Sequence, residues 1–174
     1  MKDIYYAGVG SRSTPKDVLG KMRKLSSFLS QQGVILRSGG SWSADESFES
    51  GVVELPSKSL KEIFLPFKGF RKNESDIFGV CPEARRIARE HHPNWAGIGD
   101  TGRDFIGRNS YIVLGRRLDD PVSFVVAYTP NGGIVGGTGQ VLRIAKAYEI
   151  PVFNFGKDSD DAISEGILSI LERS

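Results

Sequence analysis

The chain has few of the side chains that build disulfide frameworks and metal centres. Its 174 residues include one cysteine, Cys81, and two histidines, His91 and His92, which are adjacent in the sequence. A single thiol cannot form an internal disulfide, and without a CxxC pair we expect no structural zinc site and no other metal site. We expect the two histidines to be solvent-exposed. This cysteine usage favours a reducing, cytoplasmic setting.

Long apolar runs and an excess charge are also missing. No apolar stretch approaches the roughly 18 residues of a membrane span, and MKDIYYAGVG lacks the longer apolar core of a signal peptide. We therefore expect neither export nor a membrane partner. The 23 Lys and Arg nearly balance 21 Asp and Glu, which leaves a formal net charge of +2. Any contact with nucleic acid would therefore have to be local.

Short apolar strands alternate with amphipathic helices along the chain. We predict strands at 4–9, 34–36, 62–67, 123–128 and 151–155, and helices at 15–32, 44–53, 83–90, 105–114, 139–148 and around 163–171. Thr14 and Pro15 are expected to be the N-cap and first residue of the first helix. The alternation predicts a mostly parallel, doubly wound Rossmann-like α/β sheet. The length suits a single domain, 1–174, with an irregular insertion at 68–104.

Three glycine- and serine-rich turns each follow a predicted strand and precede a predicted helix. They read GSRST at 10–14, RSGGSWS at 37–43 and NGGIVGGTG at 131–139. In a doubly wound sheet such turns share the carboxyl edge, where backbone N–H groups and helix N-termini bind anions. A side chain at Gly132, Gly133, Gly136 or Gly137 would hold a phosphate or ribose away from those donors. We favour a common phosphate pocket over three plain connections that bind nothing.

The common phosphate-binding signatures do not occur. The third turn is not GxGxxG, and no Gly-Lys-Ser/Thr is present, which disfavours ATP hydrolysis of the P-loop kind. Arg12 and Arg37 offer guanidinium groups to phosphate oxygens, or else are solvated or paired with Asp45 or Glu46. Trp42 suits stacking on a base, or else forms a partly buried lid.

Acidic residues cluster in the short helix expected at 44–53. Asp45 and Glu49 are four apart and therefore share a helix face. They are our candidate catalytic residues, because a carboxylate can bind ribose hydroxyls or attack an anomeric carbon. The alternative is that these residues complement the helix dipole on a solvated face.

Four motifs occur together in the order found in the DprA/Smf DNA-processing family. They are YAGVGSRSTP, RSGGSWSAD, FIGRNSYIVLG, and VVAYTPNGG followed by GGTGQVLRIAKAYEIPVFNF. The chain thereby resembles the SLOG superfamily of Rossmann-like nucleotide-binding domains, which includes the LOG phosphoribohydrolases. The resemblance runs from Tyr5 to about Phe155, with 68–100 poorly matched. The short form is similar to stand-alone DprA-like proteins often carried by phages.

The resemblance implies particular site residues. Gly10, Ser11 and Arg12 resemble the family's phosphate-facing turn, and Ser38, Gly39 and Asp45 resemble its Ser-Gly-x-x-x-Gly-x-Asp motif. Arg108 and Asn109 resemble its Arg-Asn pair. Gly136, Gly137 and Thr138 resemble its late small-residue turn. Trp42 and Ser43 stand where DprA proteins usually have arginine and glycine. LOG enzymes carry a glutamate near the start of the following helix, where this chain has Gln140. An amide cannot exchange a proton as a carboxylate does, so hydrolysis would depend on Asp45 or Glu49.

Three functions remain open from the sequence. The leading one is binding of a nucleotide or ADP-ribose-like molecule for sensing, sequestration or processing, with no required cofactor. In it Arg12 and the turn from Gly132 to Thr138 hold phosphate, Ser38, Gly39 and Gly40 approach the ribose, and Trp42 caps the base. The alternatives are a single-stranded DNA-binding recombination accessory and an N-glycosidase acting on nucleotides. By analogy we expect a homodimer or larger assembly.

Overall fold

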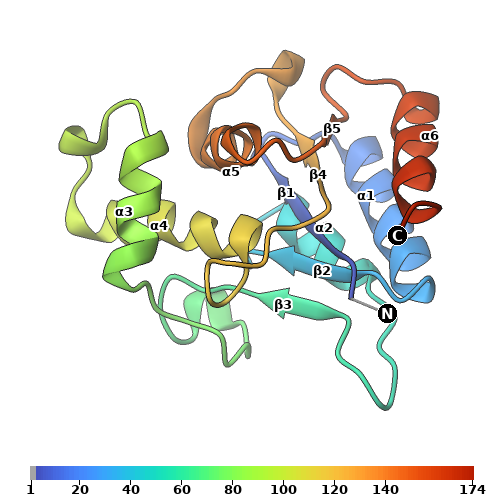
Figure 1. The fold of residues 1–174 in the computed structure, drawn as a ribbon, viewed down its shortest axis with the longest axis horizontal. Coiled ribbons are helices and arrows are strands. Elements are labelled where there is room, and N and C mark those ends of the chain that lie inside the picture. The colour runs from blue at the N-terminus through green and yellow to red at the C-terminus, as the bar shows by residue number, and fades with distance from the viewer. Residues whose placement is uncertain (1–2) are drawn as a thin grey trace.

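A single parallel sheet organises the chain. The computed structural model describes residues 3–174, and within that range five strands pair in the order β3-β2-β1-β4-β5. They are β1 (Tyr5–Gly10), β2 (Ile35–Ser38), β3 (Lys61–Ile63), β4 (Phe124–Tyr128) and β5 (Val152–Asn154). All four pairings are parallel. Figure 1 shows the helices on either side of this sheet, which confirms the predicted Rossmann-like α/β fold.

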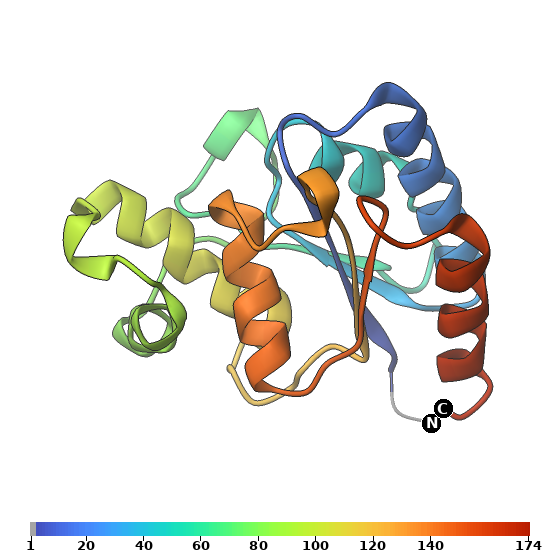
Figure 2. The same cartoon turned by 90° about the horizontal axis from the view of Figure 1, so that it is seen from above.

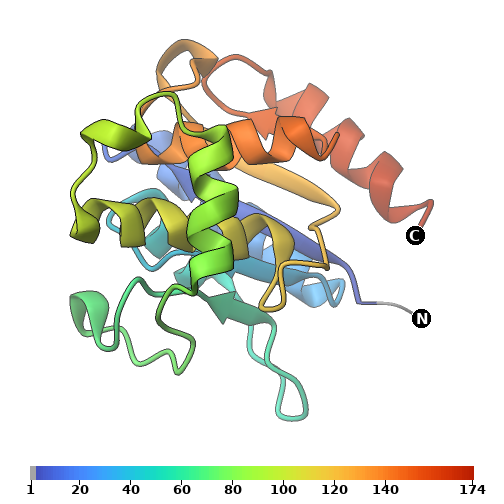
Figure 3. The same cartoon turned by 60° about the vertical axis from the view of Figure 1, so that its left-hand side comes forward.

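Six α-helices form the two outer layers. They are α1 (Lys16–Gln31), α2 (Ala44–Gly51), α3 (Pro82–His91), α4 (Asp100–Leu114), α5 (Gly136–Ala147) and α6 (Asp160–Leu171). α1, α2 and α6 bury one apolar cluster against the sheet, and α4 and α5 bury the other. Figure 2 shows the two layers from above, and Figure 3 shows α3 crossing outside α4. No helix among the described residues is long and apolar enough to span a bilayer.

The alternation of side chains along β1 feeds both layers. Tyr6 belongs to the cluster under α1, α2 and α6, whereas Ala7 and Val9 belong to the cluster under α4 and α5. The buried Tyr6 hydroxyl donates to Ser26 Oγ at 3.0 Å, and Ser26 Oγ donates to the Phe48 carbonyl at 2.6 Å. Burial raises the pKa of Tyr6 beyond its usual range, so this relay stays neutral. It joins β1, α1 and α2 through satisfied polar groups.

The strand order places the site. The chain leaves β1 toward β2 on one side and reaches β4 on the other, so the switch point of the sheet lies between β1 and β4. Crevices at such points, beyond the carboxyl ends of the strands, are where open α/β sheets bind ligands. β1 ends at Gly10, the first residue of the turn at 10–14, and β4 ends at Tyr128, three positions before the turn at 131–139.

Several predicted boundaries are wrong. Pro15, with ψ 150°, is the N-cap of α1, and Thr14 instead donates its hydroxyl to the Ser11 carbonyl at 2.6 Å. Because the backbone of Pro15 is itself extended, the helix begins one residue later than predicted, at Lys16. α5 begins at Gly136 rather than 139, and α4 at Asp100 rather than 105. β3 ends at Ile63, well before the predicted 67.

The contact between α1 and α2 predicts a sharp difference between two glycine substitutions. A Cβ on Gly51 would lie 2.3 Å from the Arg23 carbonyl oxygen, whereas a Cβ on Gly20 in α1 meets nothing within 4 Å. Gly51→Ala should lower the free energy of unfolding in urea by about 1–3 kcal/mol through overpacking. Gly20→Ala should raise it by about 0.5–1 kcal/mol through helix propensity. Equal effects of the two changes would contradict the close approach of these helices.

Candidate functional site

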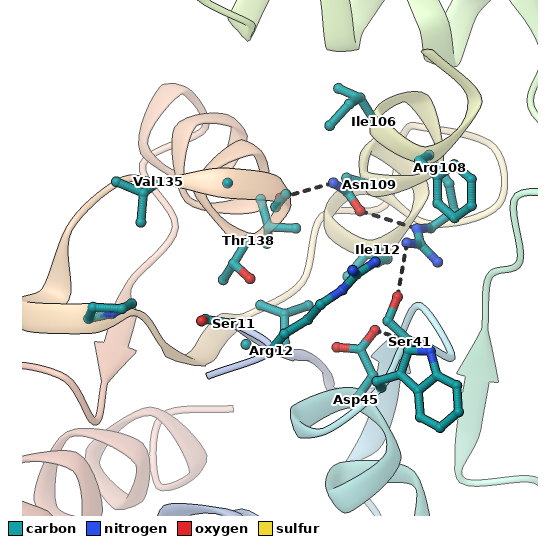
Figure 4. Close-up of a pocket in the computed structure, with 18 residues that line it drawn as sticks. Ser11, Arg12, Ser41, Asp45, Ile106, Arg108, Asn109, Ile112, Val135 and Thr138 are labelled. Atoms are coloured by element: carbon teal, nitrogen blue, oxygen red, sulfur yellow. Dashed lines mark hydrogen bonds between the residues drawn. The ribbon is translucent and has the colours of Figure 1, made fainter. Parts of the chain in front are cut away.

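A cavity of about 440 Å³, here called the central cavity, opens at the carboxyl edge of β1 and β4. Parts of all three glycine-rich turns line it together with one face of α4 (Figure 4). Its wall includes Gly10, Ser11 and Arg12; Ser41, Trp42 and Asp45; Phe105, Ile106, Arg108, Asn109 and Ile112; and Pro130, Val135, Gly136, Gly137 and Thr138. Segments more than 120 positions apart in the sequence thus share one hollow.

The β1–α1 turn contributes a free cation. Ser11 N donates to the Tyr128 carbonyl at 3.0 Å, which fixes the turn against β4. Arg12 is exposed, and it forms no hydrogen bond or ion pair with the residues that the structure describes. In Figure 4 its side chain extends from the turn in the direction of α4. Its five N–H donors are therefore open to a planar or tetrahedral anion.

The buried Arg108 joins the second turn to α4. Its side chain is 5% exposed, and Nη1 donates to the carbonyls of Gly39 and, at 3.1 Å, Phe64. A Cβ on Gly39 would lie 2.5 Å from Arg108 Nη1, so a side chain there would displace this guanidinium. Burial lowers the pKa of Arg108, and the nearby carboxyl group of Asp45 opposes that shift. Most of the N–H donors of Arg108 are therefore already hydrogen-bonded to the protein.

Asp45 carries the carboxyl group of the cavity wall. It is buried, and Oδ2 accepts a hydrogen bond from Ser41 N at 3.1 Å. Burial raises the pKa of Asp45, although Arg108 and the Ser41 N–H act in the opposite direction. A carboxyl group held in this way can accept a hydrogen bond from a hydroxyl when ionised, or donate one to an anion when protonated.

The third turn supplies an uncapped helix N-terminus. Val135 is the N-cap of α5 and offers no side-chain hydrogen bond to the first-turn N–H groups. Gly136, with φ +61°, and Gly137 have nothing within 4 Å of an added Cβ. Asn109 Nδ2 donates to the Gly137 carbonyl at 3.1 Å and so holds this first turn against α4 (Figure 4). The first-turn amides and the helix dipole together favour an anion here.

Several candidate residues lie outside the central cavity. Ser38 is buried and donates to the Gly8 carbonyl at 2.6 Å. Gly40, Gly132 and Gly133 face other parts of the protein. An added Cβ would contact Leu65 and Ile63 at Gly40, Lys157 at Gly132, and the Pro130 carbonyl at Gly133. Gly39 lies behind the wall, beneath Arg108. Ser41 occupies the cavity position that the sequence assigned to Ser38 and its neighbours.

Glu49 faces a different cavity from Asp45. It accepts a hydrogen bond from Asn73 Nδ2 at 3.0 Å and lies 3.7 Å from Lys61 Nζ. The two carboxylates, four residues apart, are therefore not paired in one site. Gln140 is also buried away from the central cavity, where its amide donates to the Ala88 carbonyl at 2.8 Å.

Arg37 has a structural position. It is buried, forms ion pairs of 2.8 Å with both Glu62 and Asp120, and stacks on the Tyr5 ring at 3.7 Å. These partners differ from Asp45 and Glu46, which the sequence offered. All three partners are more than 20 positions away along the chain, so no local spacing pointed to them.

Trp42 stands at the cavity rim with one partner. Its side chain is 60% exposed, and Arg71 Cζ lies 3.3 Å from the ring centroid. Sequence reasoning missed Arg71, because it falls in the segment between β3 and α3, where no motif marked it. The stacked guanidinium holds the indole without burying it, so the indole remains available to a planar ligand.

Ser43, the N-cap of α2, has a backbone conformation that favours glycine. Its φ is +72° and ψ −103°, and its side chain makes no capping hydrogen bond. This is the position at which the resemblance noted above expects glycine. A side chain at this backbone conformation strains the turn.

The fold recurs in solved structures of other proteins. The molybdenum cofactor (Moco) carrier protein of Chlamydomonas reinhardtii matches with a TM-score of 0.54 and 18% identity over 99% of this chain and 86% of that one. A second structure of that carrier protein gives 0.54 and 14% over 98% and 99%. DNA processing protein A from Helicobacter pylori, described with a single-stranded DNA binding mode, gives 0.55 and 16% over 98% and 72%. At these identities the likeness establishes the shared fold.

Comparisons of sequence alone add nothing to this. No protein-family model matches the chain, and no curated protein matches it.

Relief of the strain at Ser43 should be measurable. Ser43→Gly is expected to raise the free energy of unfolding by about 1 kcal/mol, because glycine adopts positive φ without a Cβ clash. Ser43→Ala is the matched control, since it removes the hydroxyl group and keeps the Cβ. It should give no such gain. Stabilisation by alanine as large as by glycine would mean that the hydroxyl group, and not the backbone, is the source of strain.

Proposed function

We propose that the protein binds a nucleotide or nucleotide derivative in the central cavity and holds it by phosphate. One observation carries the proposal: the uncapped N-terminus of α5 faces the same hollow as the guanidinium of Arg12, which has no partner among the residues that the structure describes. Amide donors and a free arginine are a common combination for phosphate. The cavity volume of about 440 Å³ lies within the range of small-molecule sites.

The other wall residues suit the remainder of such a ligand. Trp42 presents an exposed ring at the rim, on which a base can stack. Asp45 and Ser41 lie on the same side of the cavity and can hydrogen-bond ribose hydroxyl groups. Ser41 takes the role that we assigned to Ser38, Gly39 and Gly40 from the sequence, because those residues lie behind the wall.

Binding is favoured over hydrolysis of an N-glycosidic bond. Glycosidases generally use a pair of carboxylates that flank the bond. Among the described residues that line the central cavity, Asp45 is the single carboxylate. The fold itself does not decide the ligand, since folds of this kind host many functions, and the structural neighbours include a cofactor carrier and a DNA-binding protein.

Removing the free guanidinium should weaken phosphate binding. Calorimetry with AMP, ADP-ribose and NAD should give heat for at least one ligand. Arg12→Ala should lower that affinity about 10- to 100-fold, in keeping with the loss of charge-assisted hydrogen bonds. Arg117→Ala is the control, because that side chain is 85% exposed and pairs only with Asp119 among the described residues. No heat with any of the three ligands would contradict the proposal.

A single-stranded oligonucleotide, tested in the same assay, distinguishes nucleotide binding from binding of single-stranded DNA. If DNA were the partner, affinity for oligothymidylate would exceed that for the nucleotides and fall steeply with salt, because phosphate contacts release counterions. We expect weak binding to the oligonucleotide.

The raised pKa of Asp45 predicts the pH dependence of binding. Burial holds the pKa above the 3.8 of an ordinary aspartate, so the neutral form persists to higher pH than in a free carboxyl group. Asp45 lines the same cavity as Arg12 and the first turn of α5, so even from the ribose side its carboxylate repels a bound phosphate through space above that pKa, whereas the neutral group does not. The ratio of wild-type affinity to Asp45→Asn affinity should therefore fall by up to about tenfold as pH rises through the raised pKa. A ratio that is constant with pH would mean that the charge of Asp45 does not act on the bound phosphate.

Asp45→Asn also tests for chemistry. Chromatography of AMP incubated with either protein should show no released adenine. Release by the wild type that disappears in Asp45→Asn would establish hydrolysis in place of simple binding.

A further inference from the structure

A second polar hollow adjoins the central cavity behind Trp42. This side cavity has a volume of about 400 Å³. Its wall contains the cations Lys61, Arg71 and Lys72, the carboxylates Glu46 and Glu49, and Ser41, which also lines the central cavity. The two hollows therefore share Ser41 in their walls, and the Arg71 guanidinium of the side cavity stacks on Trp42 of the central one.

Arg71 has donors that the protein does not use. Its side chain is only 15% exposed, and its Nε is buried without a hydrogen-bond partner among the described residues. The one hydrogen bond that it donates is long, 3.4 Å from Nη1 to the Gly40 carbonyl, and Nη2 lies 3.9 Å from a Glu46 oxygen. The buried Nε cannot reach an added group, but the two Nη groups make no hydrogen bond shorter than 3.4 Å with the described residues, so they can turn to an external acceptor in the side cavity.

The wall of the side cavity carries three cations and two carboxylates, an excess of one positive charge. Glu49 is occupied by Asn73 and Lys61, and Lys61 also lies 3.2 Å from a Glu54 oxygen. Lys72 forms no ion pair within residues 3–174. Arg71 and Lys72 are thus the cations with capacity to spare, and they are consecutive in the chain.

The backbone holds these two cations in place. Arg71 and Lys72 both have positive φ, +55° and +60°, and Lys72 N donates to the Gly69 carbonyl at 2.9 Å. On one side Phe70 packs edge-on against Phe105, with ring centroids 5.3 Å apart. On the other side Asn73 is tied to Glu49. The crest of the loop is therefore anchored at both ends.

We propose that the side cavity is a second anion subsite, formed by Arg71 and Lys72. The ligand class is then a nucleotide with two separate phosphate groups, such as a nucleoside bisphosphate or a dinucleotide. One phosphate lies at the N-terminus of α5 beside Arg12, the ring lies on Trp42, and the second phosphate lies against Arg71. This inference rests on the proposed function for the position of the first phosphate, and two linked groups bind more tightly than either alone.

Titration with inorganic phosphate tests the subsite without assuming a ligand. In a Trp95→Phe protein, the fluorescence of Trp42 reports on both sides of its ring. We expect two saturable phosphate sites. Arg71→Ala and Lys72→Ala should each weaken one of them about tenfold, Arg12→Ala should weaken the other, and Arg117→Ala should change neither. Lys72→Ala leaves the contact between Arg71 and Trp42 in place, so it guards against a merely structural effect of Arg71→Ala.

The outcomes separate the two proposals. One site that responds to Arg12 and to neither Arg71 nor Lys72 overturns the second subsite and leaves the proposed function standing. One site that responds to Arg71 and Lys72 and not to Arg12 overturns the proposed phosphate site in the central cavity and leaves the second anion subsite standing. No saturable phosphate binding up to about 50 mM, a level well beyond millimolar affinity, overturns both.

The ligand class is tested with a matched pair of nucleotides. Adenosine 3′,5′-bisphosphate should bind the wild type at least about tenfold more tightly than AMP, and Arg71→Ala should abolish that preference, which is a ratio and so does not depend on any loss of AMP affinity through Trp42. Arg71→Lys should restore part of it, since the charge remains. Equal affinity for the two nucleotides, or no binding of either, contradicts the ligand class.

Discussion

The guanidinium of Arg108 holds together the segments that surround the central cavity. From α4 it reaches the carbonyl of Gly39 after β2 and the carbonyl of Phe64 after β3, while its neighbour Asn109 holds the first turn of α5. Each of these carbonyls would otherwise be a buried acceptor without a partner, which is costly. Because one charged group satisfies two of them at once, the edges of the cavity keep a fixed spacing without any ligand.

Four arginines of this protein fall into two groups, according to whether their N–H donors are hydrogen-bonded to the protein or remain available to a ligand. Arg37 and Arg108 are buried and bonded to the chain, so they contribute to the fold and have little left for a ligand. Arg12 and Arg71 have the opposite character, since Arg12 is exposed without a partner among residues 3–174 and Arg71 is stacked on Trp42 with its Nε unsatisfied. The same residue type thus serves two purposes, and burial with full pairing distinguishes them.

The fold could be predicted from the sequence because it depends on local periodicity. Alternating strands and helices fix parallel connections, and parallel connections bring the turns after β1, β2 and β4 to one edge. The detail of the site depends on directions that periodicity does not encode. Ser38 is the last residue of β2 and points into the core, while Ser41 lies three residues further at the wall.

Other errors arose where partners are distant in the sequence. Arg37 pairs with Asp120, 83 positions away, and Arg71 reaches Trp42 from a segment without recognisable motifs. Asp45 and Glu49 lie about one helical turn, or about 6 Å, apart along the axis of α2. Because α2 lies at the boundary of the two cavities, this distance is enough to place the two carboxyl groups in different cavities.

The first turn of α5 is built from residues that make a poor helix. Gly136, Gly137 and Gly139 lower its intrinsic stability, and no side chain caps it. Its amide hydrogens therefore exchange with solvent more readily than those deeper in the same helix. Under the proposed function an incoming phosphate acts as the missing cap, so the ligand completes a piece of secondary structure, and amide exchange at these glycines becomes a direct measure of occupancy.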